Sequence, residues 1–361
     1  MEGEMTATRP SEARLLRQLA RDIAVLLPNE WDISTSTESG KGRPDLVARI
    51  TAPDGAQTAL VIEAKRSLLP RDVPGVMAQL RRYAEQADLG EVVLVVGAPY
   101  LSETTREQIE DRGASYLDST GNVLLRSKRP ALLVRLSGAS RDPWPSDETL
   151  RSLKGRGTAR AVRALLDFAP PYGVRELASR ADVSLASLSR TVDLLDRDGL
   201  IERSGRGPIT DVDWRGVIKR WAKDYDVESS NQVSTYLDPR GLPAVATKLG
   251  KLKRGYATTG ALAAQRFSPI APTRLASIYV NDVVKWSERL ELRPTDTGGN
   301  VWLIEPFDDV VFDRTTNRDG MVCVSPTQLA VDLLTGPGRD PSEGEELLLW
   351  MERNRDAWRL R

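Results

Sequence analysis

A run of almost unbroken apolar residues, "EVVLVVGAP" (91–99), constrains the fold more than any other part of the sequence. Consecutive rather than alternating apolar residues are typical of a strand that is buried on both faces, so its sheet must be covered on both sides. Segments with the apolar spacing of amphipathic helices flank it, at 11–27, 73–87 and 102–112. We therefore expect an α/β domain with a mixed sheet in this part of the chain.

Composition divides the 361 residues into three predicted domains. The stretch "GASRDPWPSDE" (138–148) is rich in Gly, Ser, Pro and charged residues, which is typical of a linker. The predicted domains are an α/β domain at 1–140, a helical domain with a hairpin at 150–214, and a second α/β domain at 215–361. The chain is thus predicted to be a multidomain α/β protein, which its length also favours.

The scarcity of His and Cys limits the kinds of catalytic and metal-binding site that the chain can form. The sequence contains no His and a single Cys, Cys323. This composition excludes an ordinary zinc site, a Ser-His-Asp or Cys-His catalytic group, and a disulfide within the chain. A catalytic metal would have to be bound through oxygen atoms, as magnesium, manganese and calcium are.

The charge balance and hydropathy of the sequence limit how the chain could bind nucleic acid or a membrane. Lys plus Arg and Asp plus Glu both number 51, so any surface that binds nucleic acid must be a local one. No apolar run reaches the roughly 18 residues that a membrane span needs. The N-terminal segment "MEGEMTATRPSEARLL" lacks the form of a signal peptide. We expect a cytoplasmic protein without membrane contact.

Acidic residues occur at unexpected places in "RPDLVARITAPDGAQTALVIEAKR" (43–66), which is predicted to form two strands around a polar loop. Side chains alternate between the two faces of a strand, so Asp45 shares one face with Glu63 and Lys65 if the strands are neighbours. Two carboxylates repel each other unless positive charge lies between them. We therefore predict a site for Mg²⁺ or Mn²⁺ at Asp45, Glu63 and the Ala64 carbonyl, with Lys65 acting on a water molecule.

The same residues resemble the motifs of the PD-(D/E)XK nuclease family. The matching positions are Pro44-Asp45 for the first half-motif, Glu63-Ala64-Lys65 for the second, and Gln79 with Tyr83 for the Q-x-x-x-Y element of RecB-like members. The resemblance implies a restriction-endonuclease-like core and a catalytic group of Asp45, Glu63, Lys65, Gln79 and Tyr83 that cleaves nucleic acid. From the residues alone, a cross-strand ion pair and the polar edge of an amphipathic helix stay open.

The middle domain has the pattern of three helices and a hairpin. The predicted helices span 158–168, 174–181 and 185–198, and "LIERSGRGPITDVD" (200–213) forms the hairpin. The third helix is expected to bury Leu185, Leu188, Val192 and Leu195 and to expose Ser187, Ser189, Arg190 and Thr191. Arg203 and Arg206 lie on the hairpin, whose predicted tip is 204–207.

This pattern resembles the winged helix-turn-helix of bacterial regulators, and "LLDRDGLIER" (194–203) carries much of the likeness. The resemblance implies that the third helix enters the major groove of DNA, with Arg190 as the principal reader. A local basic run agrees, because Arg151, Lys154, Arg156, Arg160 and Arg163 occur without an acid among them. A winged helix that contacts protein instead stays open.

The C-terminal domain is predicted to be α/β. Strands are expected at 275–283, 300–307, 309–315 and 321–325, and helices at 255–267 and 325–336, the last capped by Ser325. The pattern only partly matches a nucleotidyltransferase-like fold. We therefore expect an interaction domain, and we interpret Asp282, Asp308, Asp309 and Asp313 as surface or turn residues rather than as a second metal site.

The arrangement of a winged helix before this domain resembles AbiEi-type antitoxins, through "GASYLDSTGNVLL" (113–125) and "EPFDDVVFDR" (305–314) with "VSPTQLAVDLL" (324–334). That resemblance implies a repressor of its own operon and a protein partner encoded nearby, in a toxin–antitoxin or phage-defence system. The nuclease-like N-terminal domain departs from the short members of that group.

The sequence favours a DNA-binding protein with a Mg²⁺-dependent nuclease centre that a winged helix brings to DNA. The alternative is a non-catalytic AbiEi-like regulator that uses the nuclease-like fold only for binding nucleic acid or a partner. A third alternative is an assembly protein without DNA affinity of its own. Dimerisation is left open, since winged-helix regulators often bind two half-sites.

Overall fold

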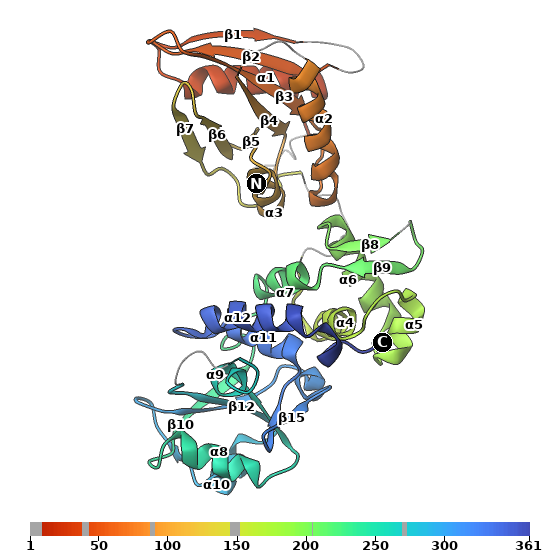
Figure 1. Ribbon diagram of the computed structural model, residues 1–361, viewed down its shortest axis with the longest axis vertical. Helices are drawn as coiled ribbons and strands as arrows, with labels where there is room; N and C mark the ends of the chain where they lie inside the picture. Colours follow the sequence, from red (N-terminus) through yellow and green to blue (C-terminus); the bar gives the residue numbers. More distant parts are fainter. Residues whose placement is uncertain (1–8, 38–42, 87–90, 145–151, 204, 269–272) are drawn as a thin grey trace, which may run out of the picture. The chain divides into compact units, whose positions relative to one another are not determined.

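A computed structural model describes residues 9–37, 43–86, 91–144, 152–203, 205–268 and 273–361 (Figure 1). The chain forms two compact units, Met1–Glu148 with Arg197–Gly199 and Thr149–Asp196 with Leu200–Arg361. The predicted domains 150–214 and 215–361 lie together in the second unit, and the division into three domains remains a prediction. Among the described residues no helix is both long and apolar enough to cross a membrane.

The first unit is built on a mixed seven-stranded sheet in the order β1-β2-β3-β4-β5-β6-β7. The neighbours β3, β4 and β5 run parallel, and the remaining neighbouring pairs are antiparallel. The strands are β1 Asp32–Ser36, β2 Leu46–Thr51, β3 Gln57–Ala64, β4 Val92–Ala98, β5 Ser115–Asp118, β6 Val123–Ser127 and β7 Leu132–Leu136. The apolar run at 91–99 forms the central strand, as the sequence predicts.

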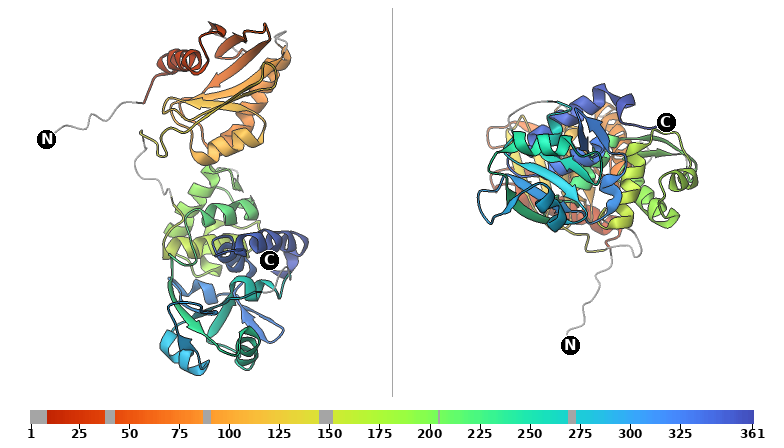
Figure 2. Two further views of the ribbon diagram at one scale, coloured as in Figure 1. Left: turned by 90° about the vertical axis from the view of Figure 1, so that its left-hand side faces the viewer. Right: turned by 90° about the horizontal axis from the view of Figure 1, so that it is seen from below.

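Helices cover both faces of this sheet (Figure 1 and Figure 2). The helices are α1 Glu12–Leu26, α2 Val73–Gln86 and α3 Glu103–Asp111, with a 3₁₀ turn at Pro70–Asp72 before α2. Residues of α1 pack on the face that holds Leu60 and Ile62, and residues of α2 and α3 pack on the face that holds Val61. Because side chains alternate along β3, Glu63 lies on the same face as α2.

The second unit begins with a three-helix bundle and a hairpin. These elements are α4 Arg156–Asp167, α5 Val174–Arg180, α6 Leu185–Arg197, β8 Ile201–Arg203 and β9 Ile209–Val212, followed by α7 Trp214–Ala222. Their order and bounds match the helices and hairpin that the sequence predicts. Leu188, Val192 and Leu195 are buried on one side of α6, as its apolar spacing requires.

A second seven-stranded sheet follows, in the order β13-β10-β14-β12-β11-β16-β15. The strands are β10 Gln232–Leu237, β11 Tyr256–Thr259, β12 Ala276–Val280, β13 Arg293–Pro294, β14 Val301–Glu305, β15 Thr316–Arg318 and β16 Met321–Cys323. The helices are α8 Leu242–Gly250, α9 Gly260–Ala264, α10 Val283–Arg289, α11 Pro326–Leu334 and α12 Asp340–Arg353, with 3₁₀ turns at Asp309–Phe312 and Arg355–Ala357.

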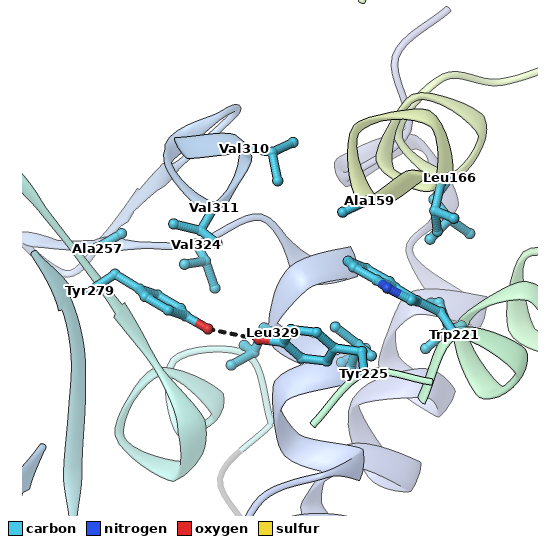
Figure 3. Packing of buried hydrophobic residues seen from close by; sticks show 14 of the residues in the cluster. Ala159, Leu166, Trp221, Tyr225, Ala257, Tyr279, Val310, Val311, Val324 and Leu329 are labelled. Carbon is cyan, nitrogen blue, oxygen red and sulfur yellow. Dashed lines mark hydrogen bonds between the residues drawn. The ribbon is translucent and has the colours of Figure 1, made fainter. Parts of the chain in front are cut away.

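The three-helix bundle with its hairpin and this sheet share one hydrophobic core (Figure 3). Ala159 and Leu166 from α4 pack in the same cluster as Ala257 of β11 and Leu329 of α11. Helix α11 contacts α4, α7 and β11, so it links the helical bundle to the sheet. The two parts of the second unit therefore fold as one body.

Two local predictions were wrong. The segment 255–267 is a strand followed by a short helix, because the β-branched Thr258 and Thr259 favour an extended chain and Gly260 turns it with φ of +64°. The segment 309–315 begins with a 3₁₀ turn, because the Asp308 side chain accepts a hydrogen bond from the Val310 amide.

Candidate catalytic and nucleic-acid-binding sites

The sheet of the first unit brings Asp45 beside Glu63. Strands β2 and β3 pair antiparallel with Leu46 opposite Ile62, so Asp45 just before β2 lies next to the end of β3. The amide of Ala64 donates to Asp45 Oδ2 at 2.8 Å. The Asp45 carboxylate thus takes the place of a strand partner for this amide, and the bond fixes the carboxylate at the carboxyl end of β3.

Glu63 is buried, with an exposed fraction of 2%, and its two oxygen atoms differ. Oε1 accepts from Lys65 Nζ at 2.5 Å and from Gln79 Nε2 at 2.8 Å. Oε2 is buried and has no hydrogen-bond partner among the residues that the structure describes. Buried carboxylate oxygens nearly always have partners, so an orphaned one is a candidate ligand for a cation or a water molecule.

Helix α2 supplies the remaining polar contacts. Gln79 and Tyr83 lie one turn apart on the same side of the helix, and Gln79 Nε2 also hydrogen-bonds the Tyr83 hydroxyl. Through Gln79 this pair reaches Glu63, whereas the apolar residues of α2 face the sheet. Four of the five predicted catalytic side chains, those of Glu63, Lys65, Gln79 and Tyr83, are therefore linked by hydrogen bonds. Asp45 is held beside them through the Ala64 amide.

The charge of this cluster is unbalanced. Burial raises the pKa of Glu63, and the nearby Asp45 carboxylate raises it further, although Lys65 and Gln79 act in the opposite direction. A carboxyl group with a raised pKa costs free energy to ionise in place. A divalent cation between Glu63 and Asp45 would offset that cost, and their oxygen atoms suit magnesium or manganese.

The donor set for such a metal is small. Within the described residues no group of three or more Asp, Glu, His or Cys side chains could hold a metal ion. A site here would consist of two carboxylates, a backbone carbonyl such as that of Ala64, and water. Magnesium usually keeps several water ligands, so this composition fits the residues present.

The three-helix bundle and its hairpin expose side chains that differ in part from those expected. Ser189 and Arg190 are exposed on α6, as predicted, and Ser187 is half-buried. Thr191 was expected outside but is fully buried, and its hydroxyl donates to the Ser187 carbonyl at 2.9 Å. Leu185 was expected inside but is 44% exposed. At the first position of α6 it lies beyond the stripe that packs on the bundle.

The two predicted hairpin cations also differ. Arg206 is exposed in the loop between β8 and β9, whereas Ser204 lies outside the described residues. Arg203 pairs with Asp193 at 2.7 Å and with Asp196 at 3.3 Å, and its side chain is only 11% exposed. Arg203 therefore neutralises acids of α6, and its contact with DNA stays a prediction.

The basic run before and within α4 is divided between the surface and the interior. Arg163 is fully buried and bonds Asp167, Gln328 and the carbonyls of Val310 and Asp313. Arg160 pairs with Asp308 at 2.9 Å, and its side chain is 38% exposed. Lys154 and Arg156 are exposed, and Arg151 lies outside the described residues. The interpretation of this run as a DNA-facing surface was wrong for Arg163, which holds α4 to α11 and to the loop after β14. For the other described cations of the run it stays a prediction.

The four acidic residues of the second sheet's loops are structural. Asp282 and Asp308 accept capping hydrogen bonds from the amides of Lys285 and Val310. Asp309 and Asp313 are exposed next to the same 3₁₀ turn. This agrees with their interpretation as surface or turn residues.

Comparisons with known proteins give few matches. No protein-family model and no curated protein matches the chain. Two solved structures resemble part of it, EndoMS in apo form (18% identity, TM-score 0.22) and a repair endonuclease from Pyrococcus abyssi (19% identity, TM-score 0.22). Each match covers 31% of this chain and about half of the other, 47% and 48% respectively. At this level of similarity they carry no argument about function.

Proposed function

We propose that the chain is a DNA-binding protein with a Mg²⁺- or Mn²⁺-dependent phosphodiesterase centre at Asp45, Glu63 and Lys65. The observation that carries the proposal is the buried, unpartnered Oε2 of Glu63 beside a second carboxylate. Few structural roles explain two acids held together with one oxygen left unsatisfied. A cation site explains both features at once.

Each residue of the cluster has a distinct task in this proposal. Asp45, Glu63 and the Ala64 carbonyl hold the metal, which supplies Lewis-acid polarisation of the phosphate and of a water molecule when bound. Lys65, with a side chain 33% exposed, hydrogen-bonds the attacking water and neutralises charge that develops on the phosphate. Gln79 and Tyr83 orient Glu63 from α2 and border the path of the nucleic acid.

Metal binding and cleavage test this centre. Calorimetry with Mg²⁺ should show saturable binding to the wild-type protein and none to Asp45→Asn plus Glu63→Gln. Asp54→Asn is the matched control, because Asp54 is an exposed acid in the turn between β2 and β3. Equal binding by all three proteins, or equal cleavage of a panel of DNA ends, would contradict the proposal.

DNA binding is assigned to α6 of the winged helix, with Arg190 as the principal contact. Arg353 on α12 provides a close control, because both arginines are exposed and both donate Nε to the carbonyl one turn earlier at 3.2 Å. We expect Arg190→Ala to weaken DNA binding and Arg353→Ala to leave it unchanged. Equal affinities of the two variants would remove α6 from the DNA interface.

A non-catalytic regulator is the second candidate, and the Lys65–Glu63 contact favours it. At 2.5 Å this ion pair already compensates part of the charge of Glu63 without a metal. In that case Asp45→Asn changes neither metal binding nor DNA affinity, while Arg190→Ala still weakens DNA binding. A protein partner or a second copy of the chain would then be detected by light scattering of the purified complex.

A further inference from the structure

The exposed face of α6 is apolar at its N-terminal end. Leu185, the first residue of the helix, is 44% exposed, and Ala186 beside it is exposed as well. One turn later the same face carries the exposed Ser189 and Arg190. A large aliphatic side chain in water at this place has no role in the packing of the bundle, whose stripe on α6 consists of Leu188, Val192 and Leu195.

No acid interrupts the first half of this face. The first acidic residue is Asp193, and Arg203 from β8 pairs with it at 2.7 Å. The acid-free stretch is confined to the helix itself, since the exposed Asp182 lies in the turn three residues before Leu185. In helix-turn-helix proteins the N-terminal residues of this helix contact the base edges.

The chemistry of Leu185 selects one feature of the major groove. Leucine has no hydrogen-bonding group, so it cannot read the donors and acceptors of the bases. The apolar group that unmodified DNA presents in this groove is the 5-methyl of thymine. An arginine, by contrast, pairs best with guanine.

We propose that Leu185, supported by Ala186, reads thymine through its 5-methyl group next to the base contacted by Arg190. This inference rests on the proposed binding of DNA by α6. It adds a sequence preference: a thymine within a base pair or two of a guanine. A protein partner that buries Leu185 is the competing use of the same side chain, and the experiment below separates the two.

The test replaces thymine by deoxyuridine, which differs only by the methyl group. A preferred duplex is first selected from a random pool with the full-length protein. Each thymine of that duplex is then replaced singly, and affinities are measured at one fixed salt concentration. Removing one buried methyl group should lower the wild-type affinity about four-fold at one or two positions.

The variants assign the effect to a side chain. With Leu185→Ala, duplexes containing thymine and deoxyuridine should bind equally well at those positions. With Arg190→Ala, affinity should fall for both duplexes while the ratio between them stays. Ser189→Ala on the same face is the control for an exposed residue without an aliphatic side chain, and its ratio should equal that of the wild type.

The outcomes are distinct. If no duplex is selected, the proposed DNA binding fails and this inference fails with it. If a duplex is selected but deoxyuridine never lowers affinity, or lowers it equally in Leu185→Ala, only the inference is overturned. Unchanged DNA binding by Leu185→Ala together with loss of a protein complex would assign the residue to a partner interface.

Discussion

Two buried carboxylates, one in each unit, differ in how completely they are satisfied. Asp332 on α11 is 1% exposed, and its oxygens accept from Thr259, Tyr279, Tyr225 and Gln328. Glu63 is 2% exposed, yet its Oε2 has no partner. Burial raises the pKa of both groups, to about 6 for Asp332. Similar burial therefore accompanies two different roles: a closed network that joins structural elements, and an incomplete one that can accept a ligand.

The network around Asp332 has a clear structural function. Tyr225, just after α7, also bonds Tyr279 of β12 at 3.0 Å (Figure 3). Thr259 lies at the end of β11. Asp332 thus connects the segment after α7 to two strands of the sheet. The two oxygen atoms of Asp332 accept hydrogen bonds from four neutral donors, so this carboxylate needs no cation as a partner.

The largest expected effect of this difference is on cleavage. We predict that Glu63→Gln lowers Mg²⁺-dependent cleavage at least about a thousand-fold, equivalent to about 4 kcal/mol of activation free energy, because the amide cannot hold the cation. Asp332→Asn should leave cleavage within about two-fold, since its network lies in the other unit. The measurement is the rate of product formation from labelled DNA at saturating Mg²⁺.

Two results would contradict the different roles assigned to Glu63 and Asp332. Cleavage that survives in Glu63→Gln would mean that the unsatisfied oxygen is not a metal ligand. Equal loss in both variants would indicate unfolding rather than chemistry, and circular dichroism of each variant decides that case.

The next effect concerns the free energy of unfolding. Here we expect the substitution of Asp332, rather than that of Glu63, to have the larger effect. Asp332→Ala leaves several buried donors without an acceptor, so we expect the free energy of unfolding to fall by about 3 kcal/mol. Glu63→Ala removes a carboxylate that is costly to bury, and the change should stay within about 1 kcal/mol. Urea unfolding of both variants without metal provides the values. A larger loss for Glu63→Ala than for Asp332→Ala would reverse the assignment of roles.

Whether the sequence alone predicts a feature of these two carboxylate sites depends on how the interacting residues are brought together. Part of the cluster of the first unit could be predicted from spacing, because strand alternation places Asp45 and Glu63 on one face and one helical turn relates Gln79 to Tyr83. That α2 brings Gln79 to Glu63 followed only from the family resemblance. The unpartnered Oε2 could not be predicted, since it depends on which oxygen Lys65 and Gln79 share. Pairing and burial are settled by three-dimensional contacts that no short motif encodes.

The second unit shows the same limit more strongly. The helices of the bundle α4–α6 follow from apolar spacing, but the burial of Arg163 depends on carbonyls about 150 positions later in the chain. Similarly, the spacing of α6 placed Leu185 on the inner stripe, although the bundle ends before it. A charged run was interpreted as a surface because the sequence did not reveal which domain would cover it.

The pH dependence of the free energy of unfolding provides a further test of the difference between Asp332 and Glu63. The folded pKa of Asp332, about 6, lies above its unfolded value, so the native state binds the proton more tightly. Stability should therefore decrease as pH rises from about 4 to about 6, by at most about 1.4 kcal/mol per pH unit from this group. In Asp332→Asn that part of the slope should vanish. Unfolding curves at pH 4, 5, 6 and 7 test it, and an identical slope in the variant would contradict the prediction.

Glu63 should respond to pH through its ligand. Because its pKa is raised, a proton competes with the cation, and Mg²⁺ affinity should increase with pH across the range in which the folded group titrates. Calorimetry in matched buffers at pH 5, 6 and 7 measures this trend. A Mg²⁺ affinity independent of pH would mean that the cation does not bind through Glu63.

The smallest effect is expected for a third pair of carboxylates, which is satisfied by a cation at the surface. Arg203 neutralises Asp193 and Asp196 on α6, and its side chain is 11% exposed whereas that of Asp193 is 58% exposed. Removing Arg203 would leave two acids close to DNA, so we predict that Arg203→Ala weakens DNA binding about five-fold, or about 1 kcal/mol.

If Arg203 acts only by neutralising these acids, adding Asp193→Asn should restore most of the affinity. If it contacts phosphate directly, the double variant should bind as weakly as Arg203→Ala, and its affinity should depend less on salt than that of the wild type. Unlike Asp332, whose donors are neutral, these two acids share a cationic partner in Arg203.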